Sequence, residues 1–471
     1  MRPSLARLCL PVIGVSRSNE PALSLEHFHA ATRVRKNLNS IPIESTKSAH
    51  RKLRSAAHGP RTFAFRLDQK PPQLAGLPLG RGLHCTFMDA DRTIEESLIL
   101  DAVDKFLERE VRPVAHQLES DDIWPQAIVE KMAELGLFGA TIAPEYGGLG
   151  LSATTYAKIV ERVSAVWMSV AGVFNSHLIM AAAVQRAGTE EQKRDWLPRF
   201  ATGELRGGIA LTEPDCGTDL QAIRTHAKRV DDHYVVNGSK TWITNSVEGH
   251  LLAVLVKTNP EAQPRHRGMS LMLIEKGPGF HVRRRLPKLG YRGIDTGELS
   301  FEDCKVPSDQ LIGAQEGHGL QQILQGLALG RINVAARGVG LARACLEESL
   351  RYAQIRNTFG KPIAEHQTIQ IKLADMATRV QAARLLMESA ATAYDKGDRV
   401  DLEAGMAKLF ATEAAVENSM EAMRIHGAYG YSKEFNIERY YRDAPLLAIG
   451  EGTNELQRII IAKQLVKKNP V

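Results

Sequence analysis

The stretch GEGTNELQ, residues 450–457, places one carboxylate, that of Glu451, between two glycines and ahead of an apolar run, Ile459–Ala462. Because glycine has no side chain, a substrate can approach this carboxylate closely. The apolar run predicts a final helix, whose first backbone N–H groups and positive dipole end suit an anion or a cofactor. Asn454 and Gln457 have the spacing of a capping box, which predicts where the helix starts. The alternative interpretation is an ordinary helix cap preceded by a solvated glutamate.

The composition of the 471 residues, 44% hydrophobic and 24% charged, is that of an ordinary globular protein with two or three domains. The net charge of +6 is unevenly distributed, since residues 1–87 hold 14 Lys/Arg and 4 Asp/Glu. The rest of the chain is therefore net acidic, so we predict no nucleic-acid partner. Five cysteines are scattered without paired spacing, which favours a reducing compartment and excludes a zinc motif. They are Cys9, Cys85, Cys216, Cys304 and Cys345.

Residues 1–87 are basic, poor in acids and without sustained periodicity, so we predict a disordered extension. Three interpretations remain open: a transit peptide, a disordered basic arm, or an upstream extension from a misassigned start. Met88 directly precedes the first patterned helix, which favours the misassigned start. That interpretation implies a bacterial cytoplasmic protein, whereas a transit peptide implies the mitochondrial matrix.

One segment resembles a membrane span, because Val163–Val184 contains no charged residue. Ser164, Asn175 and His177 interrupt it, and Gly172 lies in its middle. A buried helix pair in a large core explains this pattern better, and we predict no integral membrane segment.

The periodicity divides the chain into three predicted domains. Residues 88–205 have helical spacing of apolar positions, and residues 206–315 read as strands. Asn237-Gly238 within His233–Ile243 predicts a hairpin turn. Residues 316–471 return to long helices. The further predicted elements are strands at Met269–Ile274 and Gly297–Phe301, and helices at Arg331–Ile355, Gln367–Lys396, Ala404–Ile425 and after Thr453. We therefore predict an α+β multidomain fold: an all-α N-terminal domain, a small middle β domain and a C-terminal four-helix bundle.

Glycine-rich stretches do not support a Rossmann site. Gly317-His318-Gly319 and Gly338-Val339-Gly340 both lack a preceding strand of a βαβ unit. P-loop, zinc-ligand and nucleophile-elbow spacings are also missing from the sequence.

Three further segments gain meaning beside residues 450–457. They are Ala210–Asp219 (ALTEPDCGTD), Trp242-Ile243-Thr244, and Arg356–Gly360 (RNTFG) with His366-Gln367. Taken singly, they are typical of a polar surface loop, a strand with a core aromatic residue, and a helix end. Together and in this order they resemble the acyl-CoA dehydrogenase family of flavoenzymes, over about residues 90–468.

This resemblance implies FAD as the cofactor, bound between the β domain and the C-terminal helices. The implied FAD contacts are Ile209, Leu211, Thr212, Gly217, Thr218, Trp242, Ile243, Thr244, Arg356, Thr358, Gln367, Arg424, His426, Gly427, Thr453 and Glu455. Some of them are implied to reach FAD across a subunit boundary, as expected of a homotetramer. The implied substrate contacts are Thr218, Arg331 and Gly452. Cys216, Arg424 and Ala428 depart from the residues usual in the family.

The resemblance also implies the activity. We expect α,β-dehydrogenation of an acyl-CoA to the trans-2-enoyl-CoA, as in fatty acid β-oxidation, with electrons passed to an electron-transfer flavoprotein. Glu451 is the implied catalytic base, since Gly330 occupies the alternative base position used by some members. Met168 stands where glutaryl-specific members carry an arginine, which favours an uncharged acyl chain.

Three alternatives stay open at this point. The first is an acyl-CoA oxidase that is reoxidised by O₂. The second is a non-catalytic assembly protein on the same scaffold, whose mark would be loss of the base. The third is a flavin-dependent oxidase or monooxygenase acting on a substrate without CoA.

Overall fold

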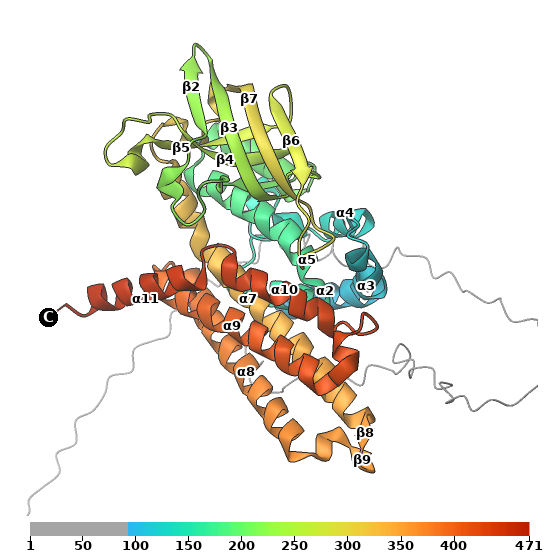
Figure 1. Cartoon of the computed structure of the whole chain (residues 1–471). Coiled ribbons are helices and arrows are strands. Elements are labelled where there is room, and N and C mark those ends of the chain that lie inside the picture. The colour runs from blue at the N-terminus through green and yellow to red at the C-terminus, as the bar shows by residue number, and fades with distance from the viewer. Residues whose placement is uncertain (1–92, 471) are drawn as a thin grey trace, which may run out of the picture.

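The computed structural model describes residues 93–470, so the predicted extension at residues 1–87 lies outside it. Helices, then strands, then helices follow one another along the chain, which confirms the predicted fold class (Figure 1). The first group contains α2 (Ile94–Phe106), α3 (Arg112–Ser120), α4 (Gln126–Glu134), α5 (Ala153–Ala187) and α6 (Glu190–Ala201). A π-helical turn, Leu107–Val111, joins α2 to α3.

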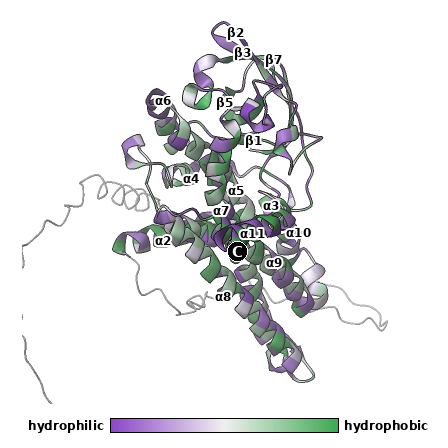
Figure 2. Ribbon diagram, turned by 90° about the vertical axis from the view of Figure 1, so that its left-hand side faces the viewer, coloured by the Kyte–Doolittle hydropathy of each residue, from purple (hydrophilic) through white to green (hydrophobic). Residues whose placement is uncertain are grey.

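The helix α5 occupies the centre of the molecule and is mostly hydrophobic (Figure 2). It covers the predicted helix pair, because Trp167 has non-helical dihedral angles, φ −157° and ψ 104°, that divide it in two. Within residues 93–470, α5 is the one helix long and apolar enough to cross a membrane. However, 94% of its most apolar window is buried inside the protein, as in a core helix.

The middle domain is a seven-stranded sheet in the order β1-β4-β2-β3-β7-β6, with β5 paired to the other side of β4. The strands are β1 (Gly207–Ala210), β2 (His226–Val230), β3 (His233–Thr244), β4 (Leu251–Lys257), β5 (Met269–Glu275), β6 (Phe280–Arg285) and β7 (Thr296–Pro307). β1 and β4 run parallel, and their register pairs Gly208 with Leu252. This parallel pairing fixes the start of the loop that follows β1.

The hairpin predicted at Asn237-Gly238 is wrong. These residues lie inside the continuous strand β3, where the register with β7 shifts between Val236 and Gly238. Gly238 is required there because a Cβ atom would lie 2.5 Å from the Thr225 hydroxyl oxygen. The actual hairpin turn lies between β2 and β3, where Asp231 takes the positive φ of 53°.

The C-terminal region contains α7 (Gly319–Ile355), β8 (Asn357–Thr358), β9 (Lys361–Pro362), α8 (Gln367–Asp395), α9 (Asp401–His426), α10 (Ile437–Ile449) and α11 (Asn454–Lys468). α7, α8 and α9 pack together as predicted, α10 is an additional helix that packs against α9 and α7, and α5 packs along α7. Gly338 and Gly340 explain how α7 approaches its neighbours so closely. Added Cβ atoms would meet the Ala411 carbonyl oxygen at 2.7 Å and the Glu161 carbonyl oxygen at 2.3 Å. These glycines therefore serve helix packing.

A buried ion pair anchors the loop after β1. The Lys240 ammonium on β3 donates to a Glu213 carboxylate oxygen and to the Leu211 carbonyl oxygen, each at 2.9 Å. Glu213 also accepts from the backbone N–H groups of Arg224 and Thr225, at 2.6 and 3.0 Å. Lys240 is fully buried and Glu213 is 5% exposed, so neither charge is solvated by water.

We predict that Lys240→Met destabilises the protein by about 3 kcal/mol or more, because it leaves the Glu213 charge buried without its cation. The midpoint of urea unfolding checks this expectation. The double variant Lys240→Met, Glu213→Gln should regain part of the loss, since no unpaired charge remains. A single variant as stable as the wild type would contradict the role given to this pair.

A second prediction concerns pH and the buried Asp443 on α10. Burial raises the pKa of Asp443 from 3.8 to about 6, although the Tyr291 backbone N–H donates to its carboxylate at 2.6 Å. The folded protein therefore holds this proton more tightly than the unfolded chain does. The stability that Asp443 contributes should fall as pH rises from about 4 to about 6.

Asp443→Asn removes this titration and keeps an oxygen acceptor for Tyr291. The difference in unfolding free energy between wild type and variant should therefore decrease between pH 4 and pH 6. Asp398→Asn, the same change at an exposed carboxyl, serves as the control. A pH-independent difference for Asp443→Asn would show that its carboxyl titrates as in the unfolded chain.

Candidate functional site

Glu451 lies in the tight connection between α10 and α11. Its φ is +54°, a left-handed conformation that costs a non-glycine residue roughly 1–2 kcal/mol. Gly452 follows with φ +86°, so consecutive left-handed residues turn the chain. This backbone conformation directs the Glu451 side chain into the protein, where the side chain is 21% exposed.

The capping box predicted for Asn454 and Gln457 is wrong. Thr453 is the N-cap residue, and its hydroxyl accepts from the Leu456 backbone N–H at 3.3 Å. Gln457 instead donates to the Gly452 carbonyl oxygen at 3.2 Å. Both predicted capping side chains therefore support the turn around Glu451 from inside the protein.

Lys408 on α9 stabilises this turn through hydrogen bonds. Its ammonium donates to the Gly452 carbonyl oxygen at 2.9 Å and to the Asn454 side-chain oxygen at 2.8 Å. A third, longer bond of 3.4 Å reaches the Ala448 carbonyl oxygen at the end of α10. Burial lowers the pKa of Lys408 to about 8, although the nearby Glu451 charge opposes the shift. This single cation thus fixes both sides of the turn.

The two oxygens of the Glu451 carboxylate have different surroundings. Oε1 accepts from the Arg337 guanidinium at 2.6 Å and from the Asn175 amide at 3.1 Å. Oε2 is buried and has no hydrogen-bond partner among the described residues. A Cβ atom on Gly330 would lie 2.8 Å from Oε2, so the missing side chain leaves room beside this oxygen. The free oxygen is the one that can take a proton from a ligand.

A polar network surrounds this carboxylate inside an otherwise apolar core. Tyr156 on α5 donates to the Asn175 side-chain oxygen at 3.2 Å and accepts from the Asn333 amide at 2.8 Å. Arg337 also donates to the Tyr291 hydroxyl at 3.3 Å. Burial raises the pKa of Tyr291 to about 12, so this phenol stays neutral at physiological pH.

One turn of α5 connects Glu451 to the β domain. Asn175 bonds Glu451, while the Val173 carbonyl oxygen two residues earlier accepts from the Asn245 amide at 2.8 Å. Asn245 directly follows Thr244, and its amide also donates to the Gly207 carbonyl oxygen in β1. The end of β3 and the start of β1 are therefore held against the turn of α5 that bonds the carboxylate.

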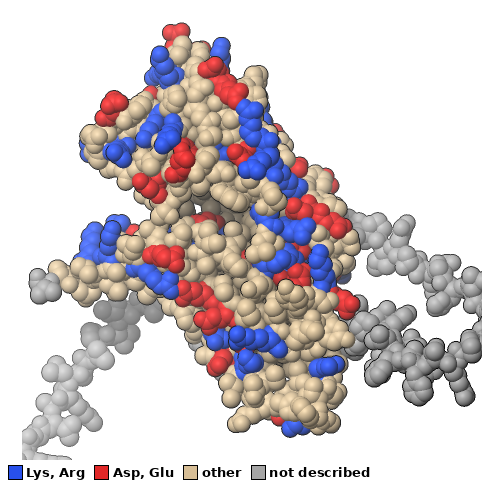
Figure 3. Space-filling view, viewed as in Figure 1, with Lys and Arg blue, Asp and Glu red and all other residues tan. Residues whose placement is uncertain are grey.

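Trp242 is the conspicuous residue at the end of β3. Its side chain is 59% exposed, and its φ of +62° is strained for an aromatic residue. Ile243 points the opposite way into the core of the sheet and is 2% exposed, so only its backbone can contact a ligand. The surface is hollowed between the β domain and the C-terminal helices (Figure 3). The exposed indole of Trp242 suits contact with a flat aromatic group such as the isoalloxazine of FAD.

Other residues of the predicted FAD set lie in or near the loop after β1. Ile209 and Leu211 are partly buried against the main core, and Thr212 accepts from the Thr241 backbone N–H at 3.0 Å. Gly217 and Thr218 are exposed. This loop thus offers both backbone groups and an exposed hydroxyl to a ligand.

A second group of predicted residues gathers elsewhere, at the end of the bundle that carries β8 and β9, far from the β domain (Figure 1). A cavity of about 320 Å³ there is lined by Tyr352, Arg356, Thr358, Ile363, His366, Ile369, Ile425, His426, Gly427, Ala428 and Tyr429. The His426 ring stacks on Tyr352 with centroids 4.2 Å apart, and burial lowers its pKa to about 4. Gln367 and Arg424 lie nearby on exposed positions, Arg424 paired with Glu421 at 2.7 Å.

The remaining predicted residues lie close to Glu451 in sequence or along α7. Thr453 and Glu455 form the cap and first turn of α11, and Glu455 is exposed. Arg331 follows Gly330 on α7, is 7% exposed and pairs with Asp401 at 3.2 Å.

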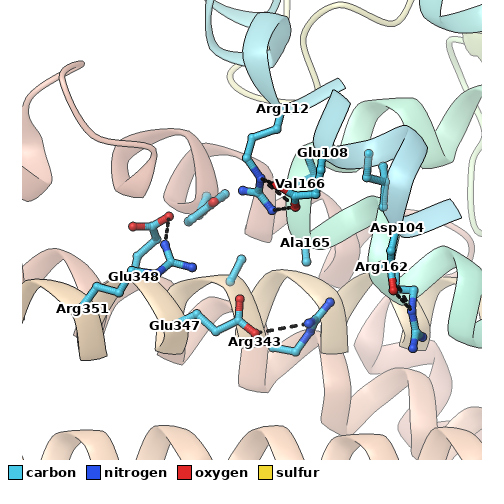
Figure 4. A pocket seen from close by; sticks show the side chains of 13 residues that line it. Asp104, Glu108, Arg112, Arg162, Ala165, Val166, Arg343, Glu347, Glu348 and Arg351 are labelled. Atoms are coloured by element: carbon cyan, nitrogen blue, oxygen red, sulfur yellow. Dashed lines mark hydrogen bonds and ion pairs between the residues drawn. The ribbon is translucent and has the colours of Figure 1, made fainter. Parts of the chain in front are cut away.

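A smaller cavity of about 80 Å³ lies between α2, α5 and α7 and contains none of the predicted residues (Figure 4). Its charged side chains pair with one another: Arg112 with Glu108, Arg162 with Asp104, Arg343 with Glu347, and Arg351 with Glu348. Because these charges are mutually compensated, the cavity is a structural feature of the helix packing.

Sequence reasoning missed the polar network around Glu451. Arg337, Asn333 and Tyr156 lie in mostly apolar, buried stretches of α5 and α7, and their hydrogen bonds cross between elements. One signal was available, because a charged residue within an apolar helical pattern is rare in a core without a partner. The partner, Glu451, could not be identified from local sequence patterns, because it lies far from Arg337 in the sequence.

The site can be compared with known proteins at this point. Family models for the N-terminal, middle and C-terminal domains of acyl-CoA dehydrogenases match residues 93–204, 208–304 and 317–466. An acyl-CoA dehydrogenase of Bacillus subtilis (strain 168) is 39% identical over 376 residues, which cover 79% of this chain and 98% of that protein.

Two solved structures are similar across the same region. Butyryl-CoA dehydrogenase from Megasphaera elsdenii superposes with a TM-score of 0.78 at 33% identity, covering 80% of this chain and 100% of that chain. A structure described as the electron transferring flavoprotein of Acidaminococcus fermentans gives a TM-score of 0.78 at 36% identity, covering 81% and 100%. From its three matched domains and these relatives, the chain belongs to the acyl-CoA dehydrogenase family of FAD-dependent oxidoreductases.

Proposed function

We propose that this protein oxidises the Cα–Cβ bond of an acyl-CoA thioester to the trans-2-enoyl-CoA and passes the electrons to an electron-transfer flavoprotein. One observation carries the proposal: the buried, unpartnered Oε2 of Glu451 in a strained turn beside Gly330. A carboxylate with one oxygen bonded and one free is oriented to accept a proton from a bound ligand.

Glu451 acts as the base that removes the Cα proton of the thioester. Such a proton is weakly acidic, so the site must also stabilise charge on the carbonyl oxygen. The backbone N–H of Glu451 is the group we assign to that oxygen, and Lys408 keeps this backbone in place through Gly452. FAD, when bound, supplies the two-electron acceptor for the Cβ hydride.

The FAD contacts divide between two copies of the chain. One copy supplies the loop after β1 and the end of β3, with Ile243 contributing its backbone, and the start of α11. These residues are Ile209, Leu211, Thr212, Gly217, Thr218, Trp242, Ile243, Thr244, Thr453 and Glu455. The other copy supplies the residues around the bundle-end cavity: Arg356, Thr358, Gln367, Arg424, His426 and Gly427. Thr218, Arg331 and Gly452 contact the substrate.

The separation of the two groups within one chain supports this division, and with it a homotetramer. Two apolar side chains near the bundle-end cavity are also exposed to solvent: Phe359 is 97% exposed and Ile371 is 56% exposed. Isolated exposure of one apolar residue is ordinary, but Phe359 extends from a tight turn beside the residues assigned to FAD. A second copy of the chain would cover both.

The assignment of an electron-transfer flavoprotein as acceptor is supported by the similar solved structure described as such a flavoprotein. The competing acceptor is O₂, as in an acyl-CoA oxidase. Residues 450–457 do not separate these two fates of the electrons, because both reactions share the step that Glu451 performs.

The central prediction is that acyl-CoA thioesters bleach the flavin of the purified protein, and that Glu451→Gln slows this bleaching about 10²- to 10⁴-fold. FAD content should stay equal in both proteins, since glutamine preserves the shape of the side chain. Stopped-flow absorbance after mixing with a panel of acyl-CoA lengths provides the measurement. Bleaching of the variant at the wild-type rate would remove Glu451 from its assigned role.

The same reduced enzyme distinguishes the acceptors. Slow reoxidation in air together with rapid reoxidation by an electron-transfer flavoprotein is the expected result. Rapid release of hydrogen peroxide would instead identify an oxidase. If no thioester changes the flavin spectrum, the remaining interpretation is an enzyme that acts on a substrate without CoA.

We also predict that Phe359→Asp shifts the protein toward smaller assemblies and lowers its FAD content, because a charge would be placed in the interface between copies. Mass photometry and the ratio of flavin to protein absorbance measure the two effects. Val230→Asp, a matched change on the outer β2–β3 hairpin, should alter neither. If Phe359→Asp keeps the wild-type assembly, this surface does not contact another copy.

A further inference from the structure

We propose that Arg337 binds a carboxylate on the acyl group, so that the substrate is a short dicarboxylic acyl-CoA. This inference rests on the proposed dehydrogenation and specifies its substrate class. It starts from a guanidinium in an unusual place: Arg337 is 4% exposed, in a stretch of α7 where Ala335, Ala336 and Val339 are fully buried. Burial of a cation among apolar residues requires an anion close by.

In the described part of the chain, the structure gives Arg337 one ion pair, with the carboxylate of Glu451 at 2.6 Å. Its Nε–H is buried and has no partner. The side chain therefore retains donor capacity beyond the bond that it makes to Glu451. A guanidinium binds carboxylates through two parallel N–H groups, and here only one of its nitrogens is used for that purpose.

The pairing conflicts with the role of Glu451 as a base. Once Glu451 has accepted the Cα proton it is neutral, and Arg337 would then be a buried charge without a counter-ion. Leaving a buried cation unpaired costs several kcal/mol, so an anion close to Arg337 would stabilise this state. Hydride transfer places a negative charge on the flavin, and a carboxylate on the ligand would supply a second anion that bonds Arg337 directly.

The neighbours of Arg337 suit a carboxylate. The side chains of Tyr156, Asn175, Asn333 and Tyr291 converge there from α5, α7 and the loop before β7, and all are neutral hydrogen-bonding groups. The Asn175 and Asn333 amides and the Tyr156 hydroxyl already donate within this network, and the Tyr291 hydroxyl accepts from Arg337. Among the described residues of this network, the buried Arg337 Nε–H is the donor without a partner, so it is the group that a ligand carboxylate would satisfy.

The geometry also limits the length of the acyl group. The guanidinium that bonds Glu451 must bond the carboxylate, and Glu451 must reach Cα, so the two ends of the acyl group are only a few bonds apart. Tyr291, which also bonds Arg337, packs closely against α5, because its hydroxyl lies 1.5 Å from where a Cβ on Gly172 would stand. Succinyl and glutaryl groups, with or without a small branch, have the required reach.

By resemblance, Met168 favours a substrate with an uncharged acyl chain, whereas Arg337 favours an acyl group that carries a carboxylate. Met168 lies on α5 and is 1% exposed, so that position indeed carries no charge. The cation enters the pocket from α7 instead. A search for a charge at one familiar position of α5 does not detect an arginine supplied by the facing helix.

Binding to a protein that cannot turn over provides the first test. The FAD-loaded, full-length Glu451→Gln variant is titrated with succinyl-CoA and glutaryl-CoA, and with butyryl-CoA and valeryl-CoA as neutral partners of equal carbon number. The dicarboxylic thioesters should bind about 10- to 100-fold more tightly, the range expected for a hydrogen bond to a charged group. Adding Arg337→Gln should abolish that difference between dicarboxylic and neutral thioesters.

Turnover provides the second test, with Glu451 intact. The ratio of kcat/KM for glutaryl-CoA to that for valeryl-CoA should exceed one in the wild type and fall at least tenfold in Arg337→Gln. Arg337→Lys keeps the charge and should retain part of the preference. Arg351→Gln, the same change at an arginine near the end of α7 that pairs with Glu348, should leave the ratio unchanged.

The outcomes separate this inference from the proposed function. Two results would mean that Arg337 merely positions Glu451. One is reduction of the flavin by neutral thioesters only, and the other is an equal loss of kcat/KM for dicarboxylic and neutral thioesters in Arg337→Gln. Either result overturns the inference while dehydrogenation stands. Failure of every acyl-CoA to reduce the flavin would overturn the proposed function and this inference together. Flavin content and circular dichroism confirm that each variant is folded.

Discussion

The bond between Glu451 and Arg337 is the interaction on which the arrangement of the site depends. It joins the turn before α11 to the middle of α7, and Asn175 extends it to α5. Two buried charges offset each other there, so neither element can shift without leaving its partner uncompensated. Lys408 on α9 also holds the turn in place, because its ammonium donates to backbone carbonyl oxygens. The strained φ of Glu451 is tolerated because bonds on both sides determine the turn.

The β domain is positioned by the same turn of α5. Val173 binds Asn245 and Asn175 binds Glu451, so one turn of α5 sets the distance between the end of β3 and Glu451. The loop after β1 is fixed independently by Lys240 and Glu213. These polar bonds supplement an apolar core that itself continues from α5 to the sheet and to α7. Precise spacing between domains requires directional bonds, which apolar contacts do not supply.

Sequence periodicity was sufficient for the order of helices and strands and for the final helix after Thr453, because these are local patterns. It failed at Asn237-Gly238, where the approach of Thr225 and not a turn demands glycine. The helix α10 was also missed, since Pro445 in its interior is unusual for a helix. Arg337 was missed for a different reason. Its importance depends on a partner more than a hundred residues away, and no local pattern records such a contact.

The assignment of substrate class follows from charge balance more than from pocket shape. A buried guanidinium must be neutralised in every state that the enzyme populates during its cycle. Glu451 can neutralise it only while ionised, yet the proton transfer assigned to Glu451 removes that charge. The two requirements are compatible when the ligand brings its own carboxylate, because Arg337 then exchanges one anion for another. The same exchange frees the base as the correct ligand arrives, so recognition of the acyl group and activation of Glu451 become one event.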